Sequence, residues 1–334
     1  MASGIPAADG AGAHTARKAD HLRVALGLPV DHVGITTGLE ALRLNARALP
    51  EVDLADVHLA TTAFGRALGA PVLVSCMTGG TSEAGSVNAA LAVAAQQHGV
   101  ALGLGSGRVL LEGGDPDSFQ VRDLAPDVPL LANLGAVQLP QVGVAGCEDL
   151  VGLTGADALV LHLNAVQEAV QLDGDTTFAG LTDCIAEVVG GLSVPVVVKE
   201  VGFGLAPADV AALIRAGVAA IDVAGAGGTN WARVEGYADA DAAVVAAAFA
   251  DWGWSTVESL RGAVAVRGSA QVRIIASGGL RDGVDAVKCL ALGADLVGFG
   301  RRLLPAAAEG PQQATRALGL LLTQMRIAVW GVGA

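Results

Sequence analysis

The chain has 334 residues, of which 52% are hydrophobic and only 3% aromatic, and it contains 46 glycines. This composition excludes a disordered chain and is typical of a protein with an aliphatic core and many tight turns. Asp and Glu number 33 against 20 Lys and Arg, and the resulting net charge of −13 repels nucleic-acid backbones and anionic lipid. We therefore expect no nucleic-acid or membrane partner, whereas a small anionic substrate would need a local group of basic side chains.

The cysteines and the N-terminal residues indicate a cytoplasmic protein. None of the four cysteines forms a C-x-x-C pair, so we expect reduced thiols. Residues 1–13 lack the basic and then apolar pattern of a signal peptide, and we expect a disordered lead-in there. The longest uncharged stretch, "VPLLANLGAVQLPQVGVAGC", contains Pro, Asn and Gln and is interpreted as strand, loop and helix rather than as a membrane span.

Residues 14–69 show few strand patterns and are predicted to form an N-terminal arm that packs on the rest of the chain or on a neighbouring subunit. The arm contains "RKADH", which places Arg17 and Lys18 at helical spacings of four and three from His21. On an acidic protein, such a group of cations can bind a diphosphate. The alternative is a solvated helix start, the usual role of a short charge run.

Residues 70–334 contain a repeated pattern of short apolar runs, each closed by Gly or a polar residue. Helix-like, Ala-rich stretches such as "PADVAALIRAG" separate most of them, which is typical of a parallel sheet. Eight such units favour closure into a (β/α)8 TIM barrel, with an open doubly wound sheet as the alternative. The eight runs are "APVLVSCMTGG", "VALGLGSG", "VPLLANLG", "ALVLHLN", "VPVVVKEVG", "AAIDVAGAGG", "VRIIASGG" and "ADLVGFGR".

Alternation within the fourth run predicts which side chains face the barrel interior. In "ALVLHLN", Leu159 and Leu161 share one face, whereas Val160, His162 and Asn164 share the other. The leucines should pack against the outer helices, and the polar pair should lie at the C-terminal end of the strand. Barrel active sites lie at that end, although a buried polar group satisfied by neighbouring backbone is the plainer alternative.

The last two runs end in "IASGGLRDG" and "GFGRR", which predict a phosphate site. In barrels, the loops after the seventh and eighth strands commonly bind phosphate through backbone N–H groups and a helix N-terminus. Glycines at 278, 279, 298 and 300 would let the backbone approach closely, and Arg281 and Arg301 would add charge. Each ending alone would be equally consistent with an ordinary turn.

Four further side chains are candidates for chemistry. Lys199 ends a very apolar strand and needs an anionic partner such as the N1–C2=O edge of a flavin, unless it extends to solvent at the rim. Glu168 offers a hard oxygen ligand for Mg²⁺, and Gln167 beside it can hydrogen-bond a substrate, although both could simply begin a helix. Arg108 follows a strand end and is a further candidate for contact with an anion.

Several of these motifs together resemble one family, the type 2 isopentenyl-diphosphate delta-isomerases, which are FMN-dependent (β/α)8 barrels. The resemblance extends from about Arg17 to the C-terminus, and the most specific motifs are "MTGG", "HLNAVQE" and "KEVG" followed by "GGT". Supporting segments are "RKADH", "ALPE", "APVLVSCMTGG", "NAALAVAA", "ANLGAVQL", "DGD", "IDVAGAGGTNW", "DWGWST" and "IASGGLRDGVDAVKCLALGADLVG".

The resemblance implies a role for each matching residue. Substrate contacts are implied for Arg17, Lys18, His21, Ser106, Arg108, Asn164 and Gln167, with Glu168 holding Mg²⁺. FMN contacts are implied for Met77, Thr78, Gly79, Ser106, Asn133, Lys199, Thr229, Gly279, Leu280, Arg281, Gly300 and Arg301. The implied catalytic residues are His162, Gln167 and Lys199.

The sequence departs from the family pattern at several places. The common "GSQR" is "GSGR" here, so Gly107 supplies no side chain, and "PEGD" is "LDGD". Ala46 stands where a histidine often precedes "ALPE", and Ala224 stands where some members have a serine. The chain also ends soon after "MRIAVWGVGA". These changes leave the expected flavin contacts and the Gln167–Glu168 pair intact.

The resemblance implies reversible isomerisation of isopentenyl diphosphate to dimethylallyl diphosphate in isoprenoid biosynthesis. Reduced FMN would act as acid and base, Mg²⁺ would bind the diphosphate, and NADPH would serve only as reductant. A homo-oligomer, either a tetramer or an octamer, is implied as well. Two alternatives stay open: an FMN-dependent oxidoreductase on the same barrel, and a non-catalytic flavin or prenyl-diphosphate binding protein, which "GSGR" keeps under consideration.

Overall fold

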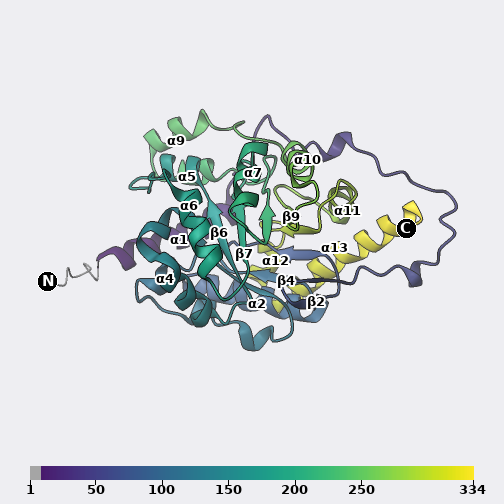
Figure 1. Ribbon diagram of the computed structural model, residues 1–334, viewed down its shortest axis with the longest axis horizontal. Helices are drawn as coiled ribbons and strands as arrows, with labels where there is room; N and C mark the ends of the chain where they lie inside the picture. Colours follow the sequence, from purple (N-terminus) through teal and green to yellow (C-terminus); the bar gives the residue numbers. More distant parts are fainter. Residues whose placement is uncertain (1–8) are drawn as a thin grey trace.

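The computed structural model describes residues 9–334, with side chains described from Arg17 onward. Within that range, eight parallel strands close into a barrel in the order β10-β3-β4-β5-β6-β7-β8-β9. Each strand lies inside one of the eight apolar runs, so the predicted (β/α)8 barrel is confirmed and the open sheet is excluded (Figure 1). The strands are β3 (Val72–Val74), β4 (Ala101–Gly103), β5 (Leu130–Gly135), β6 (Ala158–Leu163), β7 (Val196–Glu200), β8 (Ala220–Asp222), β9 (Arg273–Ala276) and β10 (Leu296–Phe299).

Helices follow the strands and cover the outside of the barrel (Figure 1). The helices are α1 (Asp9–Gly27), α2 (Ser82–His98), α3 (Arg108–Leu111), α4 (Leu139–Thr154), α5 (Ala165–Val170), α6 (Leu181–Gly191), α7 (Pro207–Arg215), α8 (Trp231–Glu235), α9 (Ala240–Ala247), α10 (Thr256–Arg267), α11 (Gly283–Ala291), α12 (Leu304–Glu309) and α13 (Pro311–Val332). Single 3-10 turns occur at η1 (Leu39–Ala41), η2 (Leu54–Asp56), η3 (Asp117–Phe119), η4 (Arg122–Leu124) and η5 (Ala136–Gln138). Among the residues described, no helix combines the length and apolarity needed to cross a bilayer.

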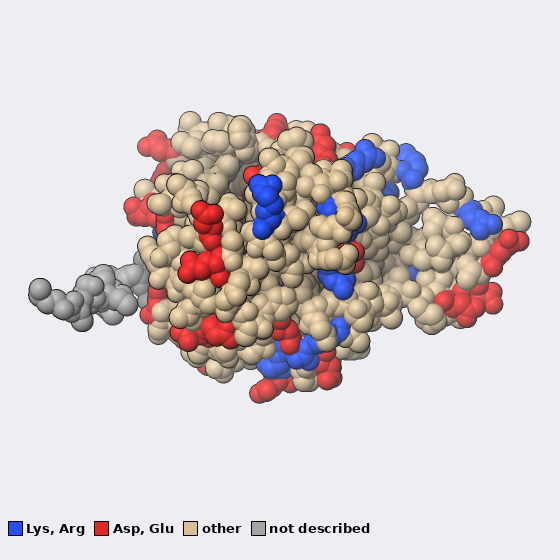
Figure 2. All heavy atoms as spheres, viewed as in Figure 1, with Lys and Arg blue, Asp and Glu red and all other residues tan. Residues whose placement is uncertain are grey.

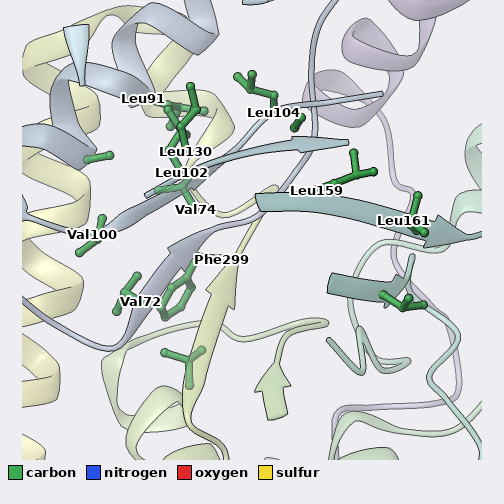
Figure 3. Packing of buried hydrophobic residues seen from close by; sticks show 14 of the residues in the cluster. Val72, Val74, Leu91, Val100, Leu102, Leu104, Leu130, Leu159, Leu161 and Phe299 are labelled. Carbon is green, nitrogen blue, oxygen red and sulfur yellow. The ribbon is translucent and has the colours of Figure 1, made fainter. Parts of the chain in front are cut away.

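The two faces of the barrel strands follow the predicted alternation. Leu159 and Leu161 belong to the outer core between strands and helices, whereas Val160 packs with the inward-facing side chains of the other strands. Figure 3 shows part of the outer core, including Val72 of β3 and Phe299 of β10. Because parallel strands hold a fixed register, this alternation fixes the inward direction of the polar residues at the strand ends.

A short antiparallel hairpin closes the N-terminal end of the barrel and was not predicted. Strands β1 (Thr61–Ala63) and β2 (Arg66–Leu68) pair across Phe64 and Gly65, which both have positive φ. Ala63 and Leu68 pack in the same interior cluster as the inward-facing side chains of the barrel strands. The N-terminal half of the barrel interior is therefore apolar and filled, and the space for a ligand lies at the opposite, C-terminal end.

The rest of the arm consists of helix α1 and an irregular segment that reaches the C-terminal helix α13. Helix α1 begins at Asp9, so residues 9–13 of the expected lead-in are helical, and residues 1–8 lie outside the described residues. After α1 the chain runs beside the C-terminal part of α13, where the Arg47 N–H donates to the Gly331 carbonyl at 2.8 Å (Figure 1). This contact places the arm beside α13 of the same chain.

Candidate active site

The C-terminal ends of the barrel strands surround a cavity of about 690 Å³. Its volume lies within the range of roughly 300–1,000 Å³ that is usual for small-molecule sites. Most of the predicted site residues line this cavity, as expected for the active end of a barrel. They are Lys18, His21, Met77, Thr78, Gly79, Ser106, Asn133, His162, Gln167, Lys199, Thr229, Gly279, Leu280, Arg281, Gly300 and Arg301.

Four predicted site residues, Arg17, Arg108, Asn164 and Glu168, do not line the cavity. Arg108 forms an ion pair with Glu112 of the following turn, with 2.7 Å between Nε and Oε1. Asn164 is buried directly after β6 and donates from Nδ2 to Glu168 Oε1 at 2.8 Å. Asn164 and Glu168 therefore lie behind Gln167, which itself faces the cavity.

Helix α1 brings Lys18 into the cavity, where the ammonium is largely shielded from water. Its Nζ donates to the Ser106 carbonyl at 2.6 Å and lies 5.5 Å from the centre of the Phe119 ring. Burial lowers the pKa of Lys18 to about 8, with Glu112 opposing and Arg108 reinforcing the shift. A half-buried cation of this kind gains from an anionic ligand, because the ligand replaces part of the lost hydration.

A buried carboxylate, Glu235, joins two predicted site residues and was missed from the sequence. His21 Nε2 lies 3.1 Å from Glu235 Oε1, and Gln167 Nε2 donates to the same oxygen at 2.7 Å. Glu235 is 5% exposed, and the ring of Trp231, one helical turn earlier on α8, meets the His21 ring edge-on at 5.8 Å. The only sequence signal was an acidic residue shortly after "GGTNW", which is too common a pattern to select.

Three polar side chains form the cavity floor. His162 Nδ1 lies 2.8 Å from Asn133 Oδ1, and because an amide oxygen only accepts, Nδ1 carries the proton and Nε2 remains an acceptor. Burial, followed by the charges of Lys199 and Lys18, lowers the pKa of His162 to about 3, so the ring is neutral. Lys199 is 8% exposed and donates from Nζ to the Glu200 carbonyl at 2.5 Å. The floor thus combines a neutral imidazole with a buried cation.

The loop after β7 is organised around Glu200, a second residue that the sequence did not reveal. Its Oε2 accepts the backbone N–H groups of residues 201 to 204 at 2.5 to 3.2 Å. These bonds make the chain bend directly after β7. Gly202, within the bent segment, lines the cavity. Glu200 therefore fixes the end of β7 and, through it, the position of the Lys199 backbone.

The predicted phosphate loops pack backbone against backbone. Gly278 and Gly279 adopt φ angles of 101° and 71°, and a Cβ on Gly279 would lie 2.6 Å from the Gly227 carbonyl oxygen. A Cβ on Gly228 would in turn lie 2.5 Å from the Gly279 nitrogen. Only glycine permits this approach and these φ values without strain.

The residues that line the cavity are suited to hold a flavin. A magnesium ion could be held only with substrate phosphates as additional ligands. The cavity offers a buried cation, a glycine-lined rim and the buried Ser75 hydroxyl, which has no partner among the described residues. No group of three or more His, Cys, Asp or Glu side chains in residues 17–334 is arranged to hold a metal by itself. Mg²⁺ commonly binds one or two carboxylates together with substrate phosphates, so Glu168 fits only that mode.

The fold and the glycine loops define a class, the FMN-dependent dehydrogenase barrels. Residues 156–334 match the family model described as FMN-dependent dehydrogenase. A solved variant of flavocytochrome b2 with sulfite bound has the same fold, with a TM-score of 0.70 at 18% identity over 94% of this chain and 79% of that one.

Curated relatives narrow the class further. The chain is 50% identical over 317 residues to an isopentenyl-diphosphate delta-isomerase of Synechococcus sp., covering 93% of this chain and 90% of the relative. It is 47% identical over 297 residues to the protein of that name from Nostoc sp., covering 88% and 84%. The chain therefore belongs to the isopentenyl-diphosphate delta-isomerase family and is an isomerase, which confirms the resemblance found in its motifs.

Proposed function

We propose that this protein interconverts isopentenyl diphosphate and dimethylallyl diphosphate with the help of FMN and Mg²⁺. The names of its relatives in Synechococcus and Nostoc support this reaction. The observation that carries the proposal is the buried Lys199, which lines the same cavity as the glycine loops and the Lys18 ammonium. Lys199 would stabilise an electron-rich ring, and Lys18 would bind a diphosphate.

The cofactor would occupy the part of the cavity between the floor and the glycine loops. Lys199 would stabilise the negative charge that reduction places on the ring, because a fixed cation in a water-poor site costs no reorganisation. When bound, reduced FMN would supply the group that gives and takes the proton, with NADPH needed only to reduce it. The backbones of the loops Gly279–Arg281 and Gly300–Arg301 would hold its phosphate, and the ring would contact Met77, Thr78, Gly79, Ser106, Asn133 and Thr229.

The diphosphate of the substrate would bind beneath α1. Lys18 and His21 both line the cavity and would contact the phosphate oxygens, with Ser106 between them and the cofactor. Arg17, Arg108 and Asn164 lie outside the cavity lining and would contribute charge or orientation from behind it. Glu168 would hold Mg²⁺, whose remaining ligands would be phosphate oxygens and water.

The hydrocarbon part of the substrate requires a dry pocket with few reactive side chains. Leu22, Ala25 and Leu26 of α1 line the cavity and would exclude water from a carbocation-like species. His162 would present its Nε2 acceptor from the floor. Gln167, held by Glu235, would present the remainder of its amide beside the reacting carbons. A double-bond shift involves no net transfer of electrons. A site whose side chains mainly orient the substrate is consistent with such a reaction.

An anaerobic assay tests the proposal. The purified protein would be incubated with isopentenyl diphosphate, Mg²⁺ and dithionite-reduced FMN, and dimethylallyl diphosphate would be measured together with solvent deuterium incorporation. We expect product and exchange only when reduced flavin and Mg²⁺ are both present. Absence of product and of exchange from a protein that binds both ligands would instead favour a non-catalytic binding protein.

The match to the FMN-dependent dehydrogenases favours one rival function, a true oxidoreductase. Such an enzyme would consume NADPH continuously in the presence of an electron acceptor. An isomerase needs reductant only in an amount comparable to its flavin. Following NADPH absorbance during turnover therefore separates the two functions in the same reaction.

A further inference from the structure

Three arginines line the phosphate end of the cavity, and the structure distinguishes them by their partners. Arg281 follows β9, and Arg301 and Arg302 follow β10. All three lie beside the glycine loops that the proposed function assigns to the cofactor phosphate. On a protein of net charge −13, three cations at one end of a cavity mark the place where an anion binds. Acidic and basic side chains are interspersed on the face shown in Figure 2. Whether a given arginine can bind an anion therefore depends on whether a neighbouring carboxylate already pairs with it.

Arg281 is already engaged by a carboxylate. Its Nε and Nη2 donate to the two oxygens of Asp285 at 2.7 and 3.0 Å, a bidentate arrangement. Asp285 is almost fully buried, and Lys288 adds a second cation 3.7 Å away. Because breaking this pair would leave a buried carboxylate short of partners, Arg281 is committed to holding the start of α11.

Arg301 is engaged by the N-terminal arm. Its Nη2 forms an ion pair with Asp31, and its Nη1 donates to the Ala25 carbonyl at 3.4 Å. The segment around Asp31 is fixed to the loop after β8, since the His32 N–H donates to the Gly228 carbonyl at 2.9 Å. Arg301 therefore fastens the arm across the rim of the cavity with both of its terminal nitrogens.

Arg302 has a free guanidinium edge. Its Nε donates to the Arg281 carbonyl at 3.0 Å, which ties the loop after β10 to the loop after β9. Its Nη1 and Nη2 groups make no hydrogen bond or ion pair within residues 17–334. An arginine anchored at Nε presents its other N–H groups as a planar fork, the arrangement that binds two oxygens of a phosphate.

We propose that Arg302 is the side chain that recognises the phosphate of the cofactor, while Arg301 serves to dock the arm. The inference rests on the proposed function, because it takes the flavin phosphate as the anion. It makes Arg302 a specificity-determining residue: the glycine loops accept the phosphate through their backbones, and Arg302 distinguishes FMN from riboflavin, which lacks that phosphate.

A comparison of the two flavins in matched variants tests the proposal. Protein depleted of flavin would be titrated with FMN and with riboflavin, with quenching of flavin fluorescence as the readout. We expect Arg302→Gln to lower the FMN-to-riboflavin affinity ratio about tenfold, the lower end for a charged hydrogen bond because this side chain is exposed. Arg302→Lys should lower the ratio less, and Arg261→Gln, a charge-matched control on α10 outside the cavity lining, should not change it.

The role of Arg301 is tested in parallel. Arg301→Gln should weaken the binding of FMN and of riboflavin by similar factors, because the substitution loosens the arm and removes no phosphate contact. An unchanged ratio in Arg302→Gln would overturn the proposal, as would an equal fall of the ratio in Arg301→Gln. If the wild-type protein bound neither flavin, the proposed function itself would fail and this inference with it. Binding of both flavins without the Arg302 effect would leave the proposed function standing.

Discussion

The half-buried Lys18 leads to a prediction in which stability and substrate binding change in opposite directions. Burial lowers the pKa of this ammonium from 10.5 to about 8. At about 1.36 kcal/mol per pKa unit, the shift corresponds to a cost of about 3 kcal/mol for keeping the charged group in the folded protein. The hydrogen bond to the Ser106 carbonyl returns part of this cost, since a charged hydrogen bond is worth about 1.5–3 kcal/mol.

The sign of the pH dependence follows from proton binding. Between pH 8 and 10.5 the unfolded chain holds a proton at Lys18 that the folded chain has released, so the free energy of unfolding rises with pH through this window. Below pH 8 the full cost is present. Lys18→Met removes the charge, and we expect it to stabilise the protein by about 1 kcal/mol at neutral pH while abolishing most substrate binding.

Substrate affinity should follow the same group. We expect KM for isopentenyl diphosphate to rise above about pH 8, by at most about tenfold per pH unit, because neutral Lys18 no longer attracts the diphosphate. Lys18→Arg keeps its charge throughout and should flatten the profile. The assay is KM against pH for both proteins, with urea unfolding of Lys18→Met. Parallel profiles in wild type and Lys18→Arg, or a Lys18→Met protein that is clearly less stable, would refute the reasoning.

Three further changes test the floor, the metal ligand and the glycine loops. Lys199→Ala should weaken FMN binding or slow its reduction by NADPH; a yellow protein that is reduced at the normal rate would argue against its role. Glu168→Gln should raise the Mg²⁺ concentration needed for turnover while FMN still binds, and unchanged turnover at limiting Mg²⁺ would remove Glu168 from the site. Gly279→Ala should lower the melting temperature and reduce FMN binding, because its φ of 71° and the nearby Gly227 carbonyl impose strain of about 1–3 kcal/mol. The control is Gly190→Ala in α6, where a Cβ meets no atom within 4 Å, and this change should leave the protein as stable or slightly more stable.

The repeated strand pattern predicted the barrel and the direction of its side chains well, because both depend on local periodicity. Leu159 and Leu161 faced the helices and Val160 the interior, since side chains of a strand alternate and a parallel register holds them there. Polar residues at strand ends, such as His162 and Lys199, followed from the same rule. The β1–β2 hairpin was missed because three-residue strands carry little periodicity.

The contacts between distant segments could not be predicted in this way. Glu235 meets His21 across 214 positions of sequence, and the pair exists only because α1 is laid over the closed barrel. The same holds for Asp31 and Arg301, which are 270 positions apart. A motif reports which residue types are present at a strand end. It does not report whether another segment supplies a counter-charge, and that decides whether an arginine such as Arg302 is free to bind a ligand.

The register of the last polar layer places Lys199 between a neutral imidazole and an acidic side chain at the cavity floor. His162 pairs with Lys199, and Lys199 with Asp222, so three neighbouring strands present these side chains in one row. Burial raises the pKa of Asp222 while Lys199 counteracts that shift, and one carboxylate oxygen accepts from Ser277 Oγ at 2.6 Å. The other oxygen is buried without a partner among the described residues. Asp222 is therefore the acidic side chain on the strand next to Lys199, and its hydrogen bonds within the barrel satisfy only one of its two oxygens. A slip of one residue in this register would turn all three side chains toward the helices and remove both interactions.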